Sequence, residues 1–405
     1  MLRLTLLFLC VVVGMSVINP GVTASTPTPP DLCEKSTFCD ELPFAKPAVD
    51  ERIELLAIVF RLAGAKEFAC KSFKKYDDDI NKHFGKFKDH EVIQLARKMN
   101  SEQMLNISND RVIGFAVACD ITDGHVILTE ENAAALEENW RMFGMTFWPK
   151  ATALEFAKLL DDFYVKSRFR EFFVSQKELY DRYEERFFDL VRFFDFHWFD
   201  EFYGMKHGER FKVYLLITGE DGGYGAMLPR KDGTKDYYGI VGLSPRYIND
   251  YGEPFYVEGM VRNCMLLYNL YYAESLLEKH YPLFKKTSER LYPHVADRIG
   301  KVVGSNMMNA KKMVQYYIMY AAFAEYSKAH LCDDALADLD GIEKYGFVWF
   351  GKMQEAVERY LNERDKYPAF DDFMPEIAEV QNTVVTDEFL RNMRRAKASA
   401  KVDVK

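Results

Sequence analysis

The side chains of this chain best suited to chemistry are its eight histidines, because a neutral imidazole can ligate a metal ion or accept a proton. They are His83, His90, His125, His197, His207, His280, His294 and His330. A helical zinc-peptidase motif needs two histidines one turn apart, with a glutamate beside the first as general base. No two of the eight are separated by three or four positions. We therefore expect no metal ion and no other cofactor, and a zinc site built from dispersed residues is the less favoured alternative.

Other catalytic patterns are incomplete. Residues 242–246, GLSPR, begin like the nucleophile turn of a hydrolase, but they lack the second glycine and Pro245 has no N–H for an oxyanion hole. Residues 222–225, GGYG, lie between two expected strands, so a hairpin explains them better than a phosphate-binding loop. Cys264 lies among apolar residues, and Asp77–Asp79 lack calcium-loop spacing. We interpret Cys264 as a core residue and Asp77–Asp79 as part of a solvated surface.

A hydrolase with a relocated site is the remaining enzyme hypothesis. Its candidate residues are Glu274, His280 and His294, which fall on one expected helix and its successor. The simpler interpretation places Glu274 and His280 at solvated or helix-terminal positions, with His280 favoured by the negative end of the helix dipole. We prefer the simpler interpretation.

The N-terminus predicts export. Residues 1–24 combine Arg3, an apolar run and a small-residue end, a pattern typical of a signal peptide cleaved after Ala24. We expect a secreted or extracellular protein, or a periplasmic one if the source is bacterial. No later stretch of about 18 uncharged apolar residues follows, so stable membrane insertion is not expected. The 62 acidic residues outnumber the 53 basic ones, which argues against a nucleic-acid partner.

Six cysteines remain after this cleavage, and an even number in an exported chain permits up to three disulfides. The candidates are Cys33, Cys39, Cys70, Cys119, Cys264 and Cys332. Cys33 and Cys39 flank a short polar stretch, so a local bridge between them fits. The other four lie in apolar helical surroundings, where reduced core thiols are nearly as good an interpretation. The sequon at Asn106 permits glycosylation in a eukaryotic host.

The pattern along the chain predicts an α+β fold, predominantly helical with a small antiparallel or mixed sheet in the middle and one covered sheet face. Strand-like runs occupy 211–218 and 236–244, with a short strand between them. Helices are expected at 256–281 (ending before Pro282), 306–330, 345–363 and 375–381. The expected parts are an extended Pro/Ser/Thr-rich lead (25–47), one domain (48–383; helical 48–205, sheet 206–255, helical 256–383) and a basic flexible tail (384–405).

Four segments together resemble a family known as a domain of unknown function, found in exported proteins of Bacteroidetes-type bacteria and similar to gluzincin metallopeptidases. They are DERIELLAIVFRLAG (50–64), YDDDINKHFGKFKDHEVIQLAR (76–97), LLEKHYPLFKK (276–286) and YLNERDKYPAFDDFMPEI (360–377). The four occur in the family's order and span most of the chain. The resemblance therefore implies a gluzincin-like fold.

The same resemblance implies where a His-Glu-x-x-His motif would lie. Its first histidine falls near Leu266, its glutamate near Leu267 and its second histidine near Leu270, while a third ligand on a following helix falls near Tyr316. Leucine and tyrosine in these positions remove the metal rather than adjust its affinity. We expect a non-catalytic binding or regulatory protein, a pseudo-peptidase, with an unknown peptide or protein partner that docks at exposed strand edges.

A structural or host-interaction protein in an extracellular setting is the third hypothesis. The aromatic region 163–203 would supply its contacts, although Phe and Tyr at helical spacing are more often core.

Overall fold

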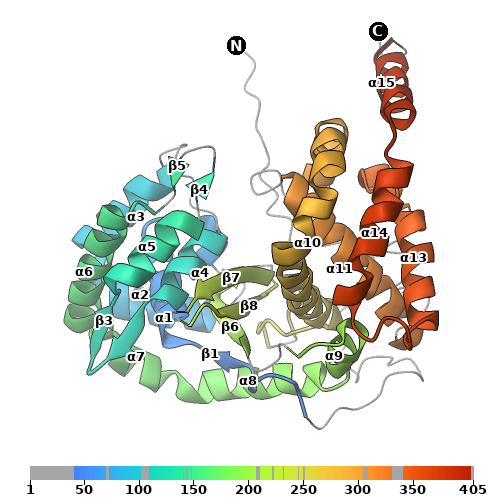
Figure 1. The fold of residues 1–405 in the computed structure, drawn as a ribbon. Helices are drawn as coiled ribbons and strands as arrows, with labels where there is room; N and C mark the ends of the chain where they lie inside the picture. The colour runs from blue at the N-terminus through green and yellow to red at the C-terminus, as the bar shows by residue number, and fades with distance from the viewer. Residues whose placement is uncertain are drawn as a thin grey trace.

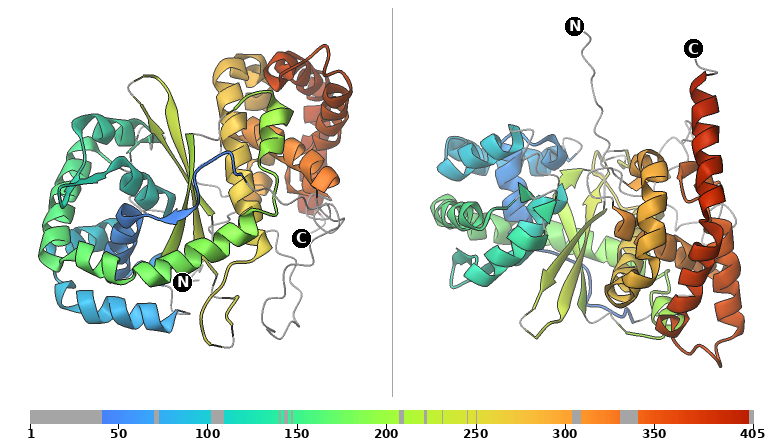
Figure 2. Two further views of the ribbon diagram at one scale, coloured as in Figure 1. Left: turned by 90° about the horizontal axis from the view of Figure 1, so that it is seen from below. Right: turned by 45° about the horizontal axis from the view of Figure 1, so that its top comes forward.

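The computed structural model describes residues 41–402, except 70–72, 102–108, 140, 143–144, 147, 207–209, 221–222, 231, 245, 250, 304–308 and 331–340. Helices dominate, and one mixed sheet lies between two helical groups (Figures 1 and 2). This confirms the α+β class. Cys33, Cys39, Cys70, Cys332 and Asn106 lie outside the described residues.

The central sheet has the strand order β1-β6-β8-β7. Its strands are β1 (Ala48–Val49), β6 (Phe211–Glu220), β7 (Gly223–Pro229) and β8 (Lys235–Leu243). β6 pairs in parallel with β1 and with β8, and β7 pairs antiparallel with β8. Because β8 lies between β6 and β7, the expected hairpin at 222–225 is wrong: the two strands that it connects are not neighbours.

The first helical group covers one face of the sheet, with α1 on β6 and α4 on β7. Its helices are α1 (Glu51–Leu62), α2 (Lys74–Phe84), α3 (Glu91–Ser101), α4 (Asn109–Ala118), α5 (Glu130–Asn139), α6 (Lys150–Ser167) and α7 (Phe169–Ser175). Two short hairpins accompany them, β2–β3 (Asp120–Thr122, His125–Ile127) and β4–β5 (Arg141–Met142, Met145–Thr146). Asp50 caps α1 by accepting from the backbone N–H groups of Arg52 and Ile53.

The second helical group lies on the other side, where α10 packs on β7 and β8 (Figure 2). It contains α10 (Glu258–Val303), α11 (Ala310–His330), α13 (Phe350–Asn362), α14 (Phe370–Val384) and α15 (Asp387–Val402). α8 (Lys177–Val191) and α9 (His197–Tyr203) join the two groups. Both faces of the sheet are therefore covered, and the expectation of one covered face is wrong.

α10 does not end at Pro282; it continues through Pro282 and Pro293 to Val303. Each proline removes one intrahelical hydrogen bond, which normally ends or bends a helix. Here α14 lies against the segment, and Gln381 donates to the carbonyl oxygen of Phe284 at 3.3 Å. Phe284 is fully buried, so tertiary packing outweighs the local cost.

Both ends of the expected domain also need correction. Phe44, in the lead that was expected to be poorly packed, is buried with its ring centroid 5.0 Å from Phe196 and 5.5 Å from Phe211. The expected flexible tail includes the helix α15, and Leu390 in its first turns is buried. No helix in the described part of the chain is both long enough and apolar enough to cross a membrane.

Candidate functional site

The positions that the resemblance selects lie on the paired helices α10 and α11. Gln315 of α11 donates to the carbonyl oxygen of Leu270 at 3.0 Å, and Asn269 of α10 donates to that of Met319 at 2.7 Å. Lys312 forms an ion pair with Glu274 at 3.6 Å. As the residue number of the contact increases along α10, it decreases along α11, so the two helices run antiparallel.

This arrangement brings Tyr316 to the level of Leu270, because the preceding residue of α11 is the one bonded to the Leu270 carbonyl. Leu266 is buried, whereas Leu267, Leu270 and Tyr316 are partly buried and pack against the core. One helical turn separates Leu266 from Leu270, so both lie toward one face of α10.

Strand β7 lies directly beside these positions. A Cβ atom added to Gly225 would approach Leu267 Cδ2 to 3.2 Å and the Tyr271 hydroxyl to 2.8 Å. That hydroxyl lies 3.0 Å from the carbonyl oxygen of Ala226 and 3.1 Å from that of Tyr238. Because Gly225 has no side chain, α10 can lie close to β7. The hydrogen bonds from the Tyr271 hydroxyl to the carbonyl groups of Ala226 and Tyr238 hold the helix in that position.

The chemistry available at these four positions is limited. Leu266 and Leu270 stand one turn apart, and neither side chain has a lone pair to offer a metal. Tyr316 packs near Tyr320, with ring centroids 6.0 Å apart, and burial raises the pKa of the Tyr320 phenol. Among the described residues, no group of three His, Cys, Asp or Glu side chains is placed to hold a metal ion.

The candidates for a relocated site take separate partners. Glu274 pairs with Lys312, whereas His280 is buried with Nε2 2.7 Å from a carboxylate oxygen of Asp371 at the start of α14. Lys279 binds the other oxygen of Asp371. His280 therefore links α10 to α14. The simpler interpretation expected a solvated or helix-terminal position for His280 and is wrong for this residue, which is buried in the interior of α10.

The two described cysteines, Cys119 and Cys264, are buried free thiols. Burial raises the pKa of both, because a thiolate is poorly solvated in an apolar core. They match the interpretation as reduced core thiols, and neither forms the disulfide that the sequence allowed.

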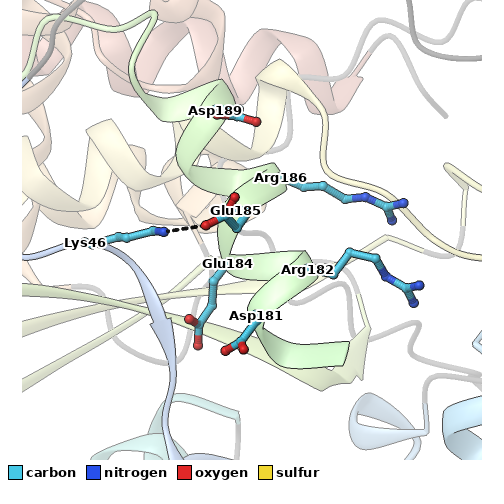
Figure 3. Close-up of a pocket in the computed structure, with 7 residues that line it drawn as sticks. All are labelled: Lys46, Asp181, Arg182, Glu184, Glu185, Arg186 and Asp189. Carbon is cyan, nitrogen blue, oxygen red and sulfur yellow. Dashed lines mark hydrogen bonds and ion pairs between the residues drawn. The ribbon is translucent and has the colours of Figure 1, made fainter. Parts of the chain in front are cut away.

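One surface cavity of about 410 Å³ lies away from these helices, along α8 (Figure 3). Its lining residues are Lys46, Asp181, Arg182, Glu184, Glu185, Arg186 and Asp189. The two arginines point to one side and Asp181 and Glu184 to another, so the charged groups do not converge. Lys46 pairs with Glu185 at 3.2 Å, and Arg182 with Glu253 at 3.1 Å. The lining groups of this cavity thus do not form one converging set of charges.

Sequence reasoning missed one buried carboxyl group, Glu54 of α1. Its oxygens accept from the backbone N–H groups of Ile217 (2.6 Å) and Thr218 (3.2 Å), the Tyr76 hydroxyl (2.9 Å) and the Thr218 hydroxyl. Burial raises the pKa of Glu54, and these hydrogen bonds only partly offset that effect. The available signal was an acidic residue inside the buried run ERIELLAIVF.

The geometry defines a class: an α+β protein in which two packed helices beside the last strand of a mixed sheet present apolar and phenolic side chains. The chain belongs to the family described as Domain of unknown function (DUF4932), whose model matches residues 47–380. The prediction that the chain belongs to a family known as a domain of unknown function is therefore confirmed. Comparisons with curated proteins and with solved structures found no match.

Proposed function

We propose that this protein is an exported, non-catalytic relative of gluzincin metallopeptidases that acts by binding a peptide or protein partner. The observation that carries the proposal is the common level of Leu270 and Tyr316 on adjacent helices, with Leu266 one turn away. The resemblance assigns metal ligands to these three positions. A register chosen from sequence alone had no reason to bring residues of two helices to one level, so the level that Leu270 and Tyr316 share supports the gluzincin-like alignment.

The side chains at these positions account for the absence of catalysis. Without imidazole ligands these positions hold no metal ion. No metal then lowers the pKa of a bound water to near neutrality or polarises the carbonyl group of a substrate. Leu266 instead contributes to the apolar core beneath the sheet. The scaffold keeps its stability because buried leucine replaces the metal cluster as the link between its elements.

The place of binding in this proposal is the surface beside β7. Leu267 lies beside Gly225 of this strand, and Leu270, three residues further along α10, is also partly exposed. Among the described strands, β7 is the last one of the sheet and pairs with β8. An extended peptide would pack an apolar side chain on these leucines. Export rests on the signal-peptide pattern of residues 1–24. The binding domain of this proposal is the predicted domain, residues 48–383, together with the flanking parts that pack on it at Phe44 and Leu390.

The first test measures metal content and peptidase activity of the purified chain. We expect less than about a tenth of an equivalent of zinc and no cleavage of an unfolded protein substrate. Stoichiometric zinc together with chelator-sensitive cleavage would refute the proposal.

A second test restores the motif. The variant carrying Leu266→His, Leu267→Glu, Leu270→His and Tyr316→Glu should bind about one equivalent of zinc, because three ligands then converge. The control carries Leu266→His and Leu270→His only, and it should bind zinc more weakly because one ligand is missing. A restored variant that folds, as judged by circular dichroism, but binds no more zinc than the wild type would show that the gluzincin alignment is wrong.

A further inference from the structure

Charge is divided unevenly along this chain. Residues 279–303, the second part of α10, and residues 387–402, which form α15, contain eleven Lys and Arg but four Asp and Glu, a formal charge of +7. Because the whole chain carries −9, all other residues together carry −16. Folding does not require this separation, since like charges held close together repel. The two segments are therefore candidates for binding an anion.

The fold places the two segments in contact. Arg290 of α10 forms an ion pair with Asp387 at the start of α15, and the two helices pack together there. Figure 1 shows α15 extending away from the body of the molecule, beyond the end of α14. The excess positive charge thus lies on two neighbouring helical segments, of which α15 projects from the body of the protein.

Five of the eleven cations on these two segments are exposed and form no ion pair in the described part of the chain. They are Lys285, Lys286, Lys301, Arg391 and Arg394. We call these five the basic ridge. In contrast, Arg52 and Arg61 in the first helical group are paired, with Asp50 and Asp77. An unpaired exposed cation costs little in water and remains free to bind an anionic group.

The orientation of α15 decides the kind of partner. Leu390 is buried, and Phe389 and Met393 pack against the core, so the described apolar side chains of this helix face inward. Arg391 and Arg394 are exposed on the outside. No described apolar side chain of α15 is thus available to insert into a lipid layer, which favours a purely electrostatic interaction.

The spacing of the cations favours a polymer over a small anion. Lys285 and Lys301 are separated by about 24 Å of helix length, at 1.5 Å per residue. One small anion could contact only one or two cations across that length. A linear polymer with regularly repeated anionic groups can follow that length, contact several of the cations and release its counterions.

We propose that the basic ridge binds a linear polyanion, such as a sulfated polysaccharide. The negative charge of the remaining surface repels such a polymer and directs it to the ridge. None of the five ridge residues is among the α10 and α11 positions of the proposed peptide site, so this inference does not rest on the proposed function.

The test measures binding of a fluorescent heparin oligosaccharide to the full chain at several salt concentrations. Two variants remove separate parts of the ridge: Lys285→Glu with Lys286→Glu, and Arg391→Glu with Arg394→Glu. The control, Lys75→Glu with Lys82→Glu on α2, makes the same charge change at exposed, unpaired lysines elsewhere. We expect each ridge variant to weaken binding about tenfold or more near 50 mM salt, and the control less than about twofold.

Every outcome bears on the proposal. Equal weakening by the control would show that net charge alone matters, and would overturn it. Undetectable binding to both heparin and duplex DNA at low salt would also overturn it, as would tighter binding to vesicles of anionic phospholipid. Preference for heparin or for duplex DNA identifies sulfate or phosphate as the bound group, and either supports a linear polyanion. Because two separate variants are used, misfolding of one, seen as a lowered Tm, leaves the other informative.

Discussion

Glu54 offers the sharpest test of the physical reasoning, because its carboxyl group satisfies backbone donors that the sheet leaves unpaired. The register between β6 and β8 shifts between Leu216 and Glu220, so Ile217 and Thr218 have no partner on β8. Both are fully buried, and Glu54 accepts from both of their N–H groups. Removing this acceptor would leave two buried donors without partners.

Two substitutions separate the shape of this group from its charge. Glu54→Leu should lower the free energy of unfolding by about 2–6 kcal/mol, since each unsatisfied buried donor costs about 1–3 kcal/mol. Glu54→Gln should change it by only about 1 kcal/mol or less, because the carboxamide oxygen can accept from both N–H groups. Its NH₂ group can donate to the hydroxyl groups of Thr218 and Tyr76, and Tyr76 retains its contact with Tyr180.

The pH dependence follows from the direction of the pKa shift. Burial raises the pKa of Glu54, so the folded chain binds its proton more tightly than the unfolded chain. This contribution to stability is complete below the unfolded pKa and is lost as the pH rises through the folded pKa. Glutamine does not titrate, so Glu54→Gln should gain in stability relative to the wild type as the pH rises.

Urea unfolding at pH 5, 7 and 9, followed by tryptophan fluorescence, would measure these differences. The control is Glu91→Gln, since Glu91 is exposed and has no partner among the described residues. The reasoning is refuted if Glu54→Gln is as destabilising as Glu54→Leu at pH 7 with a pH profile parallel to that of the wild type. That result would mean that an ionised carboxylate is required.

Three further predictions follow from single contacts. His280→Ala should lower the free energy of unfolding by about 1–3 kcal/mol through loss of the Asp371 contact; an unchanged urea midpoint would contradict this. A thiol reagent should label Cys119 and Cys264 only after denaturation, as peptide mass spectrometry would show, and rapid labelling of the native chain would oppose their burial. Gly225→Val should destabilise the fold and Gly85→Val much less so in urea unfolding, because a Cβ atom at Gly225 would meet α10 whereas one at Gly85, with φ −55°, would meet nothing within 4 Å; equal losses would argue against that close approach.

Part of the fold followed directly from local patterns. Apolar residues at helical spacing and strand-like runs predicted the α+β class and most helix positions, because these patterns record which side of an element is buried. Two predicted boundaries failed for one reason. Pro282 should end α10 and Phe44 should lie in a loose lead, but contacts with residues distant in sequence hold both in the packed structure.

By itself, the sequence determined the residue types at Leu266 and Leu270, and ligand chemistry depends on residue type: leucine cannot become a metal ligand in any conformation. It also determined the charge imbalance between residues 279–303, residues 387–402 and the rest. Only the tertiary structure decided which residues meet. The insertion of β8 between β6 and β7, the level shared by Leu270 and Tyr316, and the burial of Glu54 all depend on long-range packing. Local sequence patterns carry no information about which distant surfaces will be buried together.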